Sequence, residues 1–236
     1  MVVRFAPELR FFLLPCHRHA QVHLDPDPTS TLGHIVDSLG VPPTEVGAFT
    51  VHGAAVTSSY RPHPGDHVEV AAVERPQPLP QWPPTFLLDV HLGTLARRLR
   101  LLGVDTAYDN DRDDPSLVRQ ANAEGRVLLT RDRELLCRKN LHTGGHVRHD
   151  RPDDQLCEVL ERFAPPLEPW TRCLACNGLL TSAAKGEVDE HLCAGTRATY
   201  DTFARCHSCG QVYWPGAHHE RLEPIVCGAQ ALLDPG

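Results

Sequence analysis

Four aspartates stand where predicted strands give way to a turn or a helix. In VLLTRDREL (127–135), an apolar run leads through a threonine to an aspartate with an arginine on each side. The run TFLLDV (85–90) also contains an aspartate, and an acidic pair opens the helix predicted after VDTAY (104–108). Parallel strands end at one edge of their sheet, where ligands bind. We therefore expect four carboxylates to gather there: Asp89, Asp113, Asp114 and Asp132.

Such a cluster needs a counter-ion, because neighbouring carboxylates repel one another and raise each other's pKa. Oxygen ligands with open coordination positions suit Mg²⁺ or Mn²⁺. A simpler interpretation stays open for most of these acids. Asp113 or Asp114, just before Pro115, has the position of a helix N-cap, and Asp132 can cap the helix that follows it. Asp89 is harder to explain in this way, because LLDVHLG offers no comparable turn.

Two C-x-x-C pairs, CLAC and CHSC, indicate a second metal site of a different kind. Paired zinc knuckles close a tetrahedral site of four sulfurs, which leaves no open position and makes the zinc structural. Redox dithiols are the alternative, but a thioredoxin-like context is missing. The predicted ligands are Cys173, Cys176, Cys206 and Cys209, with Cys193 and His207 as substitutes, whereas Cys16, Cys137, Cys157 and Cys227 are expected to be buried or incidental thiols.

The elements around the acids alternate between strand and helix, which predicts an α/β domain with a parallel sheet covered on both faces. The helix predicted over 92–102 has leucines on one face and Arg97, Arg98 and Arg100 on the other, with Gly103 as its stop. Arg100 is expected to be solvated. Strands are predicted at 85–90, 104–108 and 126–130, and further helices at 113–124, 132–140 and 152–163.

Charge is unevenly distributed along the chain of 236 residues, whose formal net charge is −7. Residues 86–151 carry 12 Lys/Arg against 10 Asp/Glu, whereas residues 152–236 carry 6 against 12. A polyanion is therefore expected at the middle segment. The N-terminal stretch lacks a long apolar region and a cleavage site, and no apolar run approaches the roughly 20 residues of a membrane helix, so a cytoplasmic location is expected. Cysteines in that compartment favour metal over disulfides.

The first 74 residues predict the order ββαββ, with a strand pair in VVRFAPELRFFL (2–13) and HAQVHL (19–24). A helix follows in TLGHIVDSLG (31–40), and a late strand lies in HPGDHVEVAAV. This order resembles the ubiquitin-like β-grasp fold, and the late element is similar to that of small sulfur-carrier proteins. Those carriers end in a free Gly-Gly, but here the chain continues through RPQPLPQWPP (75–84), a stiff linker. An interaction module with a possible protein partner is favoured over sulfur transfer.

The stretches FLLDVHLGTLARRLRLLGVDTAYDN and RVLLTRDREL, with the acidic pair between them, resemble the Mut-seven C-terminal, PIN-like ribonuclease domain. The resemblance extends to the cysteine pairs and to YWPGAH. It implies a ribonuclease in which Asp89, Asp114 and Asp132 hold Mg²⁺ or Mn²⁺ and Asp113 is also catalytic. A metal-activated water would attack the phosphodiester of a single-stranded RNA. A fourth metal ligand would be Asp153 or Asp154, and the expected phosphate-binding residues are Arg97, Arg98, Arg131 and Arg133.

The predicted organisation is a ubiquitin-like domain (1–74), the linker (75–84), a PIN-like domain (85–165), a zinc ribbon (166–222) and a tail (223–236). A non-catalytic RNA-binding or adaptor protein with the same fold is the alternative function. The histidines of LHTGGHVRHD, namely His142, His146 and His149, match no zinc-hydrolase spacing and are expected at the surface of a Gly-rich loop. Side chains that could stack on RNA bases are Tyr213, Trp214, His218 and His219.

Overall fold

The chain folds into two compact units, each built from two segments of the sequence. The computed structural model describes residues 1–18 and 21–234. The first unit contains residues 1–78 and 113–147, and the second contains residues 79–112 and 148–236. The segment predicted as a PIN-like domain therefore contributes to both units.

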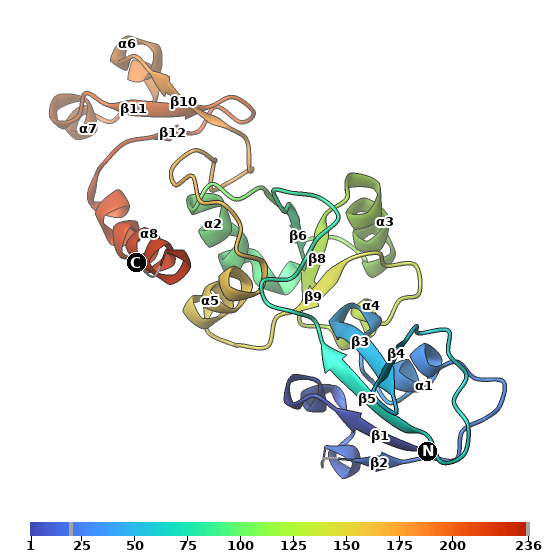
Figure 1. Ribbon diagram of the computed structural model, residues 1–236. Coiled ribbons are helices and arrows are strands. Elements are labelled where there is room, and N and C mark those ends of the chain that lie inside the picture. Colours follow the sequence, from blue (N-terminus) through green and yellow to red (C-terminus); the bar gives the residue numbers. More distant parts are fainter. Residues whose placement is uncertain (19–20, 235–236) are drawn as a thin grey trace. The chain divides into compact units, whose positions relative to one another are not determined.

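A five-stranded sheet and one helix form the N-terminal part of the first unit (Figure 1). They are β1 (Val2–Phe5), β2 (Val22–His23), α1 (Leu32–Ser38), β3 (Val46–Val51), β4 (Ala54–Val56) and β5 (His67–Ala72). The strand order is β2-β1-β5-β3-β4, in which β1 and β5 are parallel and the other neighbours are antiparallel. Helix α1 buries Leu32 and Val36 in one core with Val3, Phe5 and Val70. The predicted β-grasp fold is confirmed, with three strands after α1 where the order ββαββ predicts two.

The first predicted strand is shorter than expected, because the chain turns at Pro7. Residues after it form the 3-10 helices η1 (Pro7–Phe12) and η2 (Pro15–His17). Proline lacks the N–H that a strand ladder needs, and its fixed φ suits the first turn of a helix. The strand predicted in HAQVHL begins with residues 19–20, which lie outside the described residues, and its described part is β2.

A buried carboxylate fixes the turn that leads into β5. Asp66 is 8% exposed and accepts hydrogen bonds from the Tyr60 hydroxyl (3.0 Å), the His63 backbone N–H (2.8 Å) and His52 Nε2 (3.3 Å). Burial opposes ionisation of this group, but the three hydrogen bonds keep the pKa of Asp66 below its usual value. The adjoining Gly65 has φ +94°, a conformation that glycine adopts readily.

The Asp66→Ala substitution should lower the free energy of unfolding of the first unit by about 1–3 kcal/mol, because it leaves three donors without their acceptor. Since the pKa of this carboxylate is depressed in the folded state, its contribution is present above about pH 4 and is lost as the pH falls through the folded pKa. Urea unfolding at several pH values measures both effects. The exposed Asp25→Ala is the matched control, and equal stability of the two variants would contradict the assignment.

The remaining part of the first unit contains α3 (Asp114–Glu124), β8 (Val127–Thr130), α4 (Arg133–Leu136) and β9 (Gly144–His146). Strands β8 and β9 are parallel. The predicted strand at 126–130 and the helix that ends at Gly125 are confirmed, but the helix predicted over 132–140 is only the single turn α4. Strand β9 lies in a stretch for which the sequence predicts a loop. The reason for that prediction is the low strand propensity of its two glycines.

His146, at the end of β9, is buried rather than exposed as expected. Its backbone N–H donates to Oε1 of Glu45 (2.8 Å), which is itself buried in the 3-10 helix η3 (Pro43–Glu45). Its ring packs at 5.2 Å from the ring of Phe12 and 5.5 Å from that of Phe11, and its Nε2 lies 3.2 Å from the carbonyl oxygen of Arg131. The ubiquitin-like segment thus contacts the segment 113–147 of its own chain.

The second unit begins with β6 (Phe86–Leu88), η4 (Val90–Leu92), α2 (Gly93–Leu101), β7 (Thr106–Tyr108) and, later, α5 (Pro152–Phe163). Strands β6 and β7 are parallel, and α2 contacts both β7 and α5. These elements confirm the predicted α/β architecture with parallel strands. Gly103 ends α2 with φ +81°, and a Cβ there would lie 2.0 Å from the carbonyl oxygen of Glu168, so the predicted stop also admits no side chain.

The cysteine segment forms a three-stranded antiparallel sheet in the order β10-β11-β12. Its strands are β10 (Leu180–Ala183), β11 (Phe203–Cys206) and β12 (Val212–Tyr213), and the connection from β10 to β11 contains α6 (Lys185–Val188), η5 (Asp189–His191) and α7 (Ala194–Thr199). Its buried core consists of Val188, Leu192, Phe203 and Val212. So small a core is of the kind that usually requires a metal or another cross-link.

The expected tail after residue 222 is part of a helix, α8 (Ala217–Leu233), which lies beside α5 and contacts it (Figure 1). Val226 and Ala229 are its buried residues. The sequence does not predict this helix, because Pro224 lies within it and proline usually interrupts a helix. Among the described residues, none of the helices has the length and apolar character needed to cross a membrane.

Candidate functional site

The four predicted zinc ligands lie together. The Sγ atoms of Cys173, Cys176, Cys206 and Cys209 are all within 4.8 Å of one another, and none of the four forms a disulfide. The Cys173–Cys209 and Cys176–Cys206 pairs are separated by 3.7 and 3.4 Å. A Zn–S bond of about 2.3 Å places tetrahedral sulfurs about 3.8 Å apart. The donor set and its spacing therefore fit a structural zinc ion.

The residue after each C-x-x-C pair explains how the knuckles turn. Asn177 and Gly210 have φ values of +71° and +76°, and their backbone N–H groups donate to the carbonyl oxygens of Cys173 and Cys206, the first cysteine of each pair. Asparagine and glycine are the residues that enter this left-handed region most readily. Equivalent turns in the two pairs direct all four sulfurs to one point.

Hydrogen bonds prepare the first knuckle for metal. Burial raises the pKa of the Cys173 thiol, but the Tyr213 hydroxyl at 3.1 Å and backbone N–H groups outweigh it and lower the pKa to about 7. The same hydroxyl accepts a hydrogen bond from the Leu174 backbone N–H (3.1 Å). Tyr213, one of the residues predicted to stack on bases, thus holds the first knuckle through its hydroxyl group.

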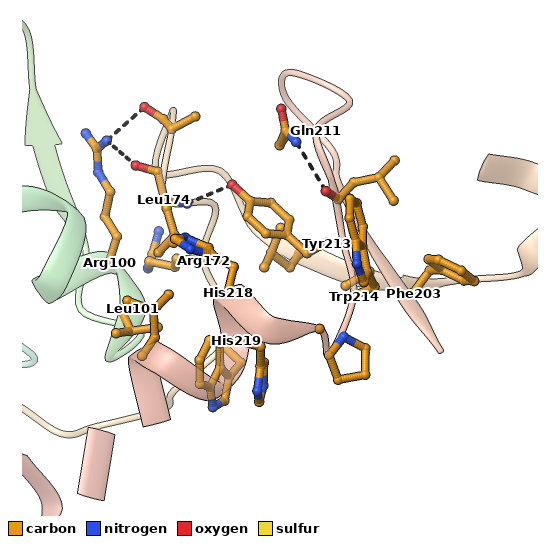
Figure 2. Close-up of a pocket in the computed structure, with 18 of the residues that line it drawn as sticks. Arg100, Leu101, Arg172, Leu174, Phe203, Gln211, Tyr213, Trp214, His218 and His219 are labelled. Carbon is orange, nitrogen blue, oxygen red and sulfur yellow. Dashed lines mark hydrogen bonds between the residues drawn. The ribbon is translucent and has the colours of Figure 1, made fainter. Parts of the chain in front are cut away.

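Arg100 is buried, contrary to its predicted place on a solvated helix face. Its Nε donates to the carbonyl oxygen of Thr106 (2.9 Å), and its Nη1 donates to the carbonyl oxygens of Leu174 (3.1 Å) and Ala175 (2.9 Å) (Figure 2). Helical periodicity predicts that Arg100 is exposed, because periodicity contains no information about contacts with a segment as distant in the sequence as the first knuckle. A single guanidinium therefore connects α2 and β7 to the first knuckle.

The Cys206→Ser variant should lose its tightly bound zinc, because the site then has three thiolates and an incomplete shell. Metal analysis of the purified protein, with circular dichroism, measures zinc content and folding. The matched control is Cys193→Ser in the same ribbon, which should retain one zinc per chain. Zinc loss in the control with retention in Cys206→Ser would contradict the ligand set.

The Arg100→Ala variant should be less stable than the wild type by about 1–3 kcal/mol or more, because it leaves three carbonyl oxygens without their donor. Lysine should restore little of this, since an ammonium group does not reproduce the planar fork of arginine. Denaturant unfolding of both variants measures the effect, with the exposed neighbour Arg97→Ala as the control. If Arg100→Ala is as stable as the wild type, these hydrogen bonds make no net contribution to the free energy of unfolding.

The four predicted aspartates all lie at the start of helical turns, and three of them cap those turns. Asp89, directly after β6, accepts from the backbone N–H of Val90 (2.6 Å), although the sequence suggested no turn there. Asp113 caps α3, and Asp132 caps α4. Asp114 forms an ion pair with Arg138 (2.9 Å). Hydrogen bonds from the side chain and backbone of Ser116 hold the pKa of Asp113 below its usual value.

The four predicted phosphate-binding arginines have different surroundings. Arg98 forms an ion pair with Asp153, one of the two acids considered as a fourth metal ligand. Arg133 donates through Nη1 to the carbonyl oxygen of Phe12 (3.2 Å), which ties it to the ubiquitin-like segment. Arg97 and Arg131 are exposed. Their exposure makes the guanidinium groups of Arg97 and Arg131 accessible to a phosphate from solvent.

Two family models match the chain. One is described as the Mut7-C RNAse domain and matches residues 84–226, and the other is described as Mut7-C ubiquitin and matches residues 1–78. No curated protein and no solved structure matches it. The first match includes the four aspartates and the four clustered cysteines, and it spans more than half of the chain. It indicates a nuclease domain.

Proposed function

We propose that this chain, which belongs to the Mut7-C RNase domain family, is a ribonuclease that hydrolyses RNA phosphodiester bonds with Mg²⁺ or Mn²⁺. The observation that carries the proposal is the family match over residues 84–226. The positions of two acids support it: Asp89 directly follows β6, and Asp132 follows β8 after one intervening residue. Carboxylates at the ends of parallel strands are suited to bind a common ligand.

The proposed metal ligands are Asp89, Asp114 and Asp132, with Asp113 as a further catalytic acid. Carboxylate oxygens are the ligands that Mg²⁺ and Mn²⁺ favour. Helix capping does not compete with this role, because a carboxylate has about four acceptor sites and the capping hydrogen bonds occupy only one or two of them. Asp113 is ionised at neutral pH, since its pKa lies below the already low value of an ordinary aspartate. A bound divalent cation would lower the pKa of a water molecule and offset charge on the phosphate.

The chain's own cations would orient the RNA backbone. Arg131 is adjacent to Asp132 and exposed, and its planar guanidinium can hold two phosphate oxygens at once. Arg98 and Arg133 would act in this way only after giving up the partners that they have, Asp153 and the carbonyl oxygen of Phe12. We assign Arg131 to the scissile phosphate because it is exposed and directly precedes Asp132 in the chain.

A non-catalytic RNA-binding protein is the second candidate, and one observation favours it. Each proposed acid already has a structural partner: three cap helical turns, and Asp114 pairs with Arg138. A cluster of negative charge facing phosphates would nevertheless weaken RNA binding unless a cation occupied it. Sulfur transfer has no such support, because β5 continues into the linker and not into a free Gly-Gly end.

The full chain should cleave a labelled single-stranded RNA when Mn²⁺ or Mg²⁺ is added and not without it. Asp89→Asn and Asp132→Asn should each reduce the rate by on the order of 10²–10³-fold, the scale of losing one electrostatic contact to transition-state charge. Gel analysis of the RNA over time measures this. The exposed Asp111→Asn is the matched control and should cleave at the wild-type rate.

Two results would contradict the proposal. Cleavage that persists in both Asp89→Asn and Asp132→Asn would remove these acids from the mechanism. RNA binding that metal improves without any cleavage would favour the non-catalytic candidate. Circular dichroism and zinc content of each variant separate loss of activity from loss of fold.

A further inference from the structure

The second unit contains a pocket of about 1190 Å³ between α2, the zinc ribbon and the start of α8 (Figure 2). Pockets for small ligands measure roughly 300–1,000 Å³, so this one has room for more than one small group. It lies outside the residues proposed for metal binding: Asp89, Asp113, Asp114 and Asp132 do not line it. Its lining combines arginines, histidines and aromatic side chains on a largely apolar wall.

Carboxylates are absent from the described lining of this pocket, although residues 152–236 as a whole carry twice as many acids as bases. Arg100 and Arg172 line it but are engaged, Arg100 with three carbonyl oxygens and Arg172 with Asp105 (3.1 Å). Arg97 is exposed and forms no ion pair with any residue of the described chain. A polyanion at this pocket would therefore meet an exposed cation, and no acid belongs to the described lining.

Two tryptophans line the pocket and offer different surfaces. Trp214 is 37% exposed. Trp170 stacks on His219 with ring centroids 3.9 Å apart and an interplanar angle of 18°, and it has φ +66°, a rare conformation for a bulky residue. Its backbone N–H is held by the carbonyl oxygen of Leu101 (3.0 Å). Backbone strain of this kind is concentrated at ligand-binding and active sites.

We propose that this pocket binds nucleotides of a single-stranded RNA, with bases stacked on Trp214 and His218 and a phosphate held by Arg97. The inference rests on the proposed function, because it takes RNA as the ligand, and it adds a second place where the RNA is held. Any base can stack on an aromatic ring, since every base has a π-face. The apolar walls can contact the bases of single-stranded RNA, whereas the bases of a duplex are paired with one another and not accessible. The expected ligand is therefore single-stranded and of no fixed sequence.

The experiment measures RNA binding separately from cleavage. In an Asp89→Asn background without added Mg²⁺ or Mn²⁺, fluorescence anisotropy reports the affinity for a fluorescein-labelled oligouridylate at several salt concentrations. Trp214→Ala should weaken binding by about 5- to 100-fold, the effect of losing one stacked base. Arg97→Ser should weaken binding and reduce the slope of log affinity against log salt by about 1, as expected for one lost phosphate contact.

The controls are Trp82→Ala, which removes an exposed tryptophan outside the pocket, and Arg221→Ser, which removes an exposed arginine on α8 that does not line it. Both should bind as the background does. His218→Ala tests stacking if Trp214→Ala loses its zinc. If His218→Ala and Arg97→Ser bind like the controls, or if the controls lose as much affinity, the pocket is not the RNA site.

The failure of the pocket inference and the failure of the proposed function can be told apart. Failure of the wild type to cleave RNA with Mn²⁺ would overturn the nuclease proposal and leave binding at the pocket intact. Cleavage by the wild type, with no effect of the pocket variants on affinity, would overturn the pocket inference alone.

Discussion

Negative charge that is brought together must be balanced, and this constraint applies both to the cysteine cluster and to the acidic site that we propose. Four sulfurs lie within 4.8 Å of one another, an arrangement that four thiolates sustain only around a cation. The proposed acidic site obeys the same physics with harder ligands, which select Mg²⁺ or Mn²⁺ over zinc. Sulfur closes the first site around its metal, whereas open positions at the second would admit substrate.

The zinc knuckles also organise what surrounds them in the second unit. Arg100 donates to the carbonyl oxygens of the first knuckle from α2, and Tyr213 holds the same knuckle from β12. Residues from α2, β12 and the start of α8 then line the pocket that we assign to RNA (Figure 2). A ribbon with a core of only a few apolar side chains thus depends on four clustered cysteines, which fit a zinc ion, and on one buried arginine.

Local chemistry determined which features the sequence could predict. The cysteine pairs, the helix stop at Gly103 and the cap at Asp113 depend on neighbouring residues, and the structure has all three. Burial of Arg100 and His146 depends on partners at least 70 positions away, Leu174 and Glu45. The hydrophobic periodicity of a local segment contains no information about such partners. Strand β9 was missed because its glycines pair with β8 in spite of their low propensity. Helix α8 was not predicted because it contains Pro224, a residue with a low helix propensity.

The acidic site is predicted from residues that are separated by up to 43 positions and share no local motif. It is therefore the prediction that most needs a direct test. A crystal structure of the full chain soaked with Mn²⁺ tests it most directly through the anomalous signal of the metal. We expect a manganese peak bound by carboxylate oxygens of both Asp89 and Asp132, at roughly the distances of hard-cation ligands, about 2.0–2.6 Å. A crystal in which these two side chains are too far apart to bind one ion would contradict it.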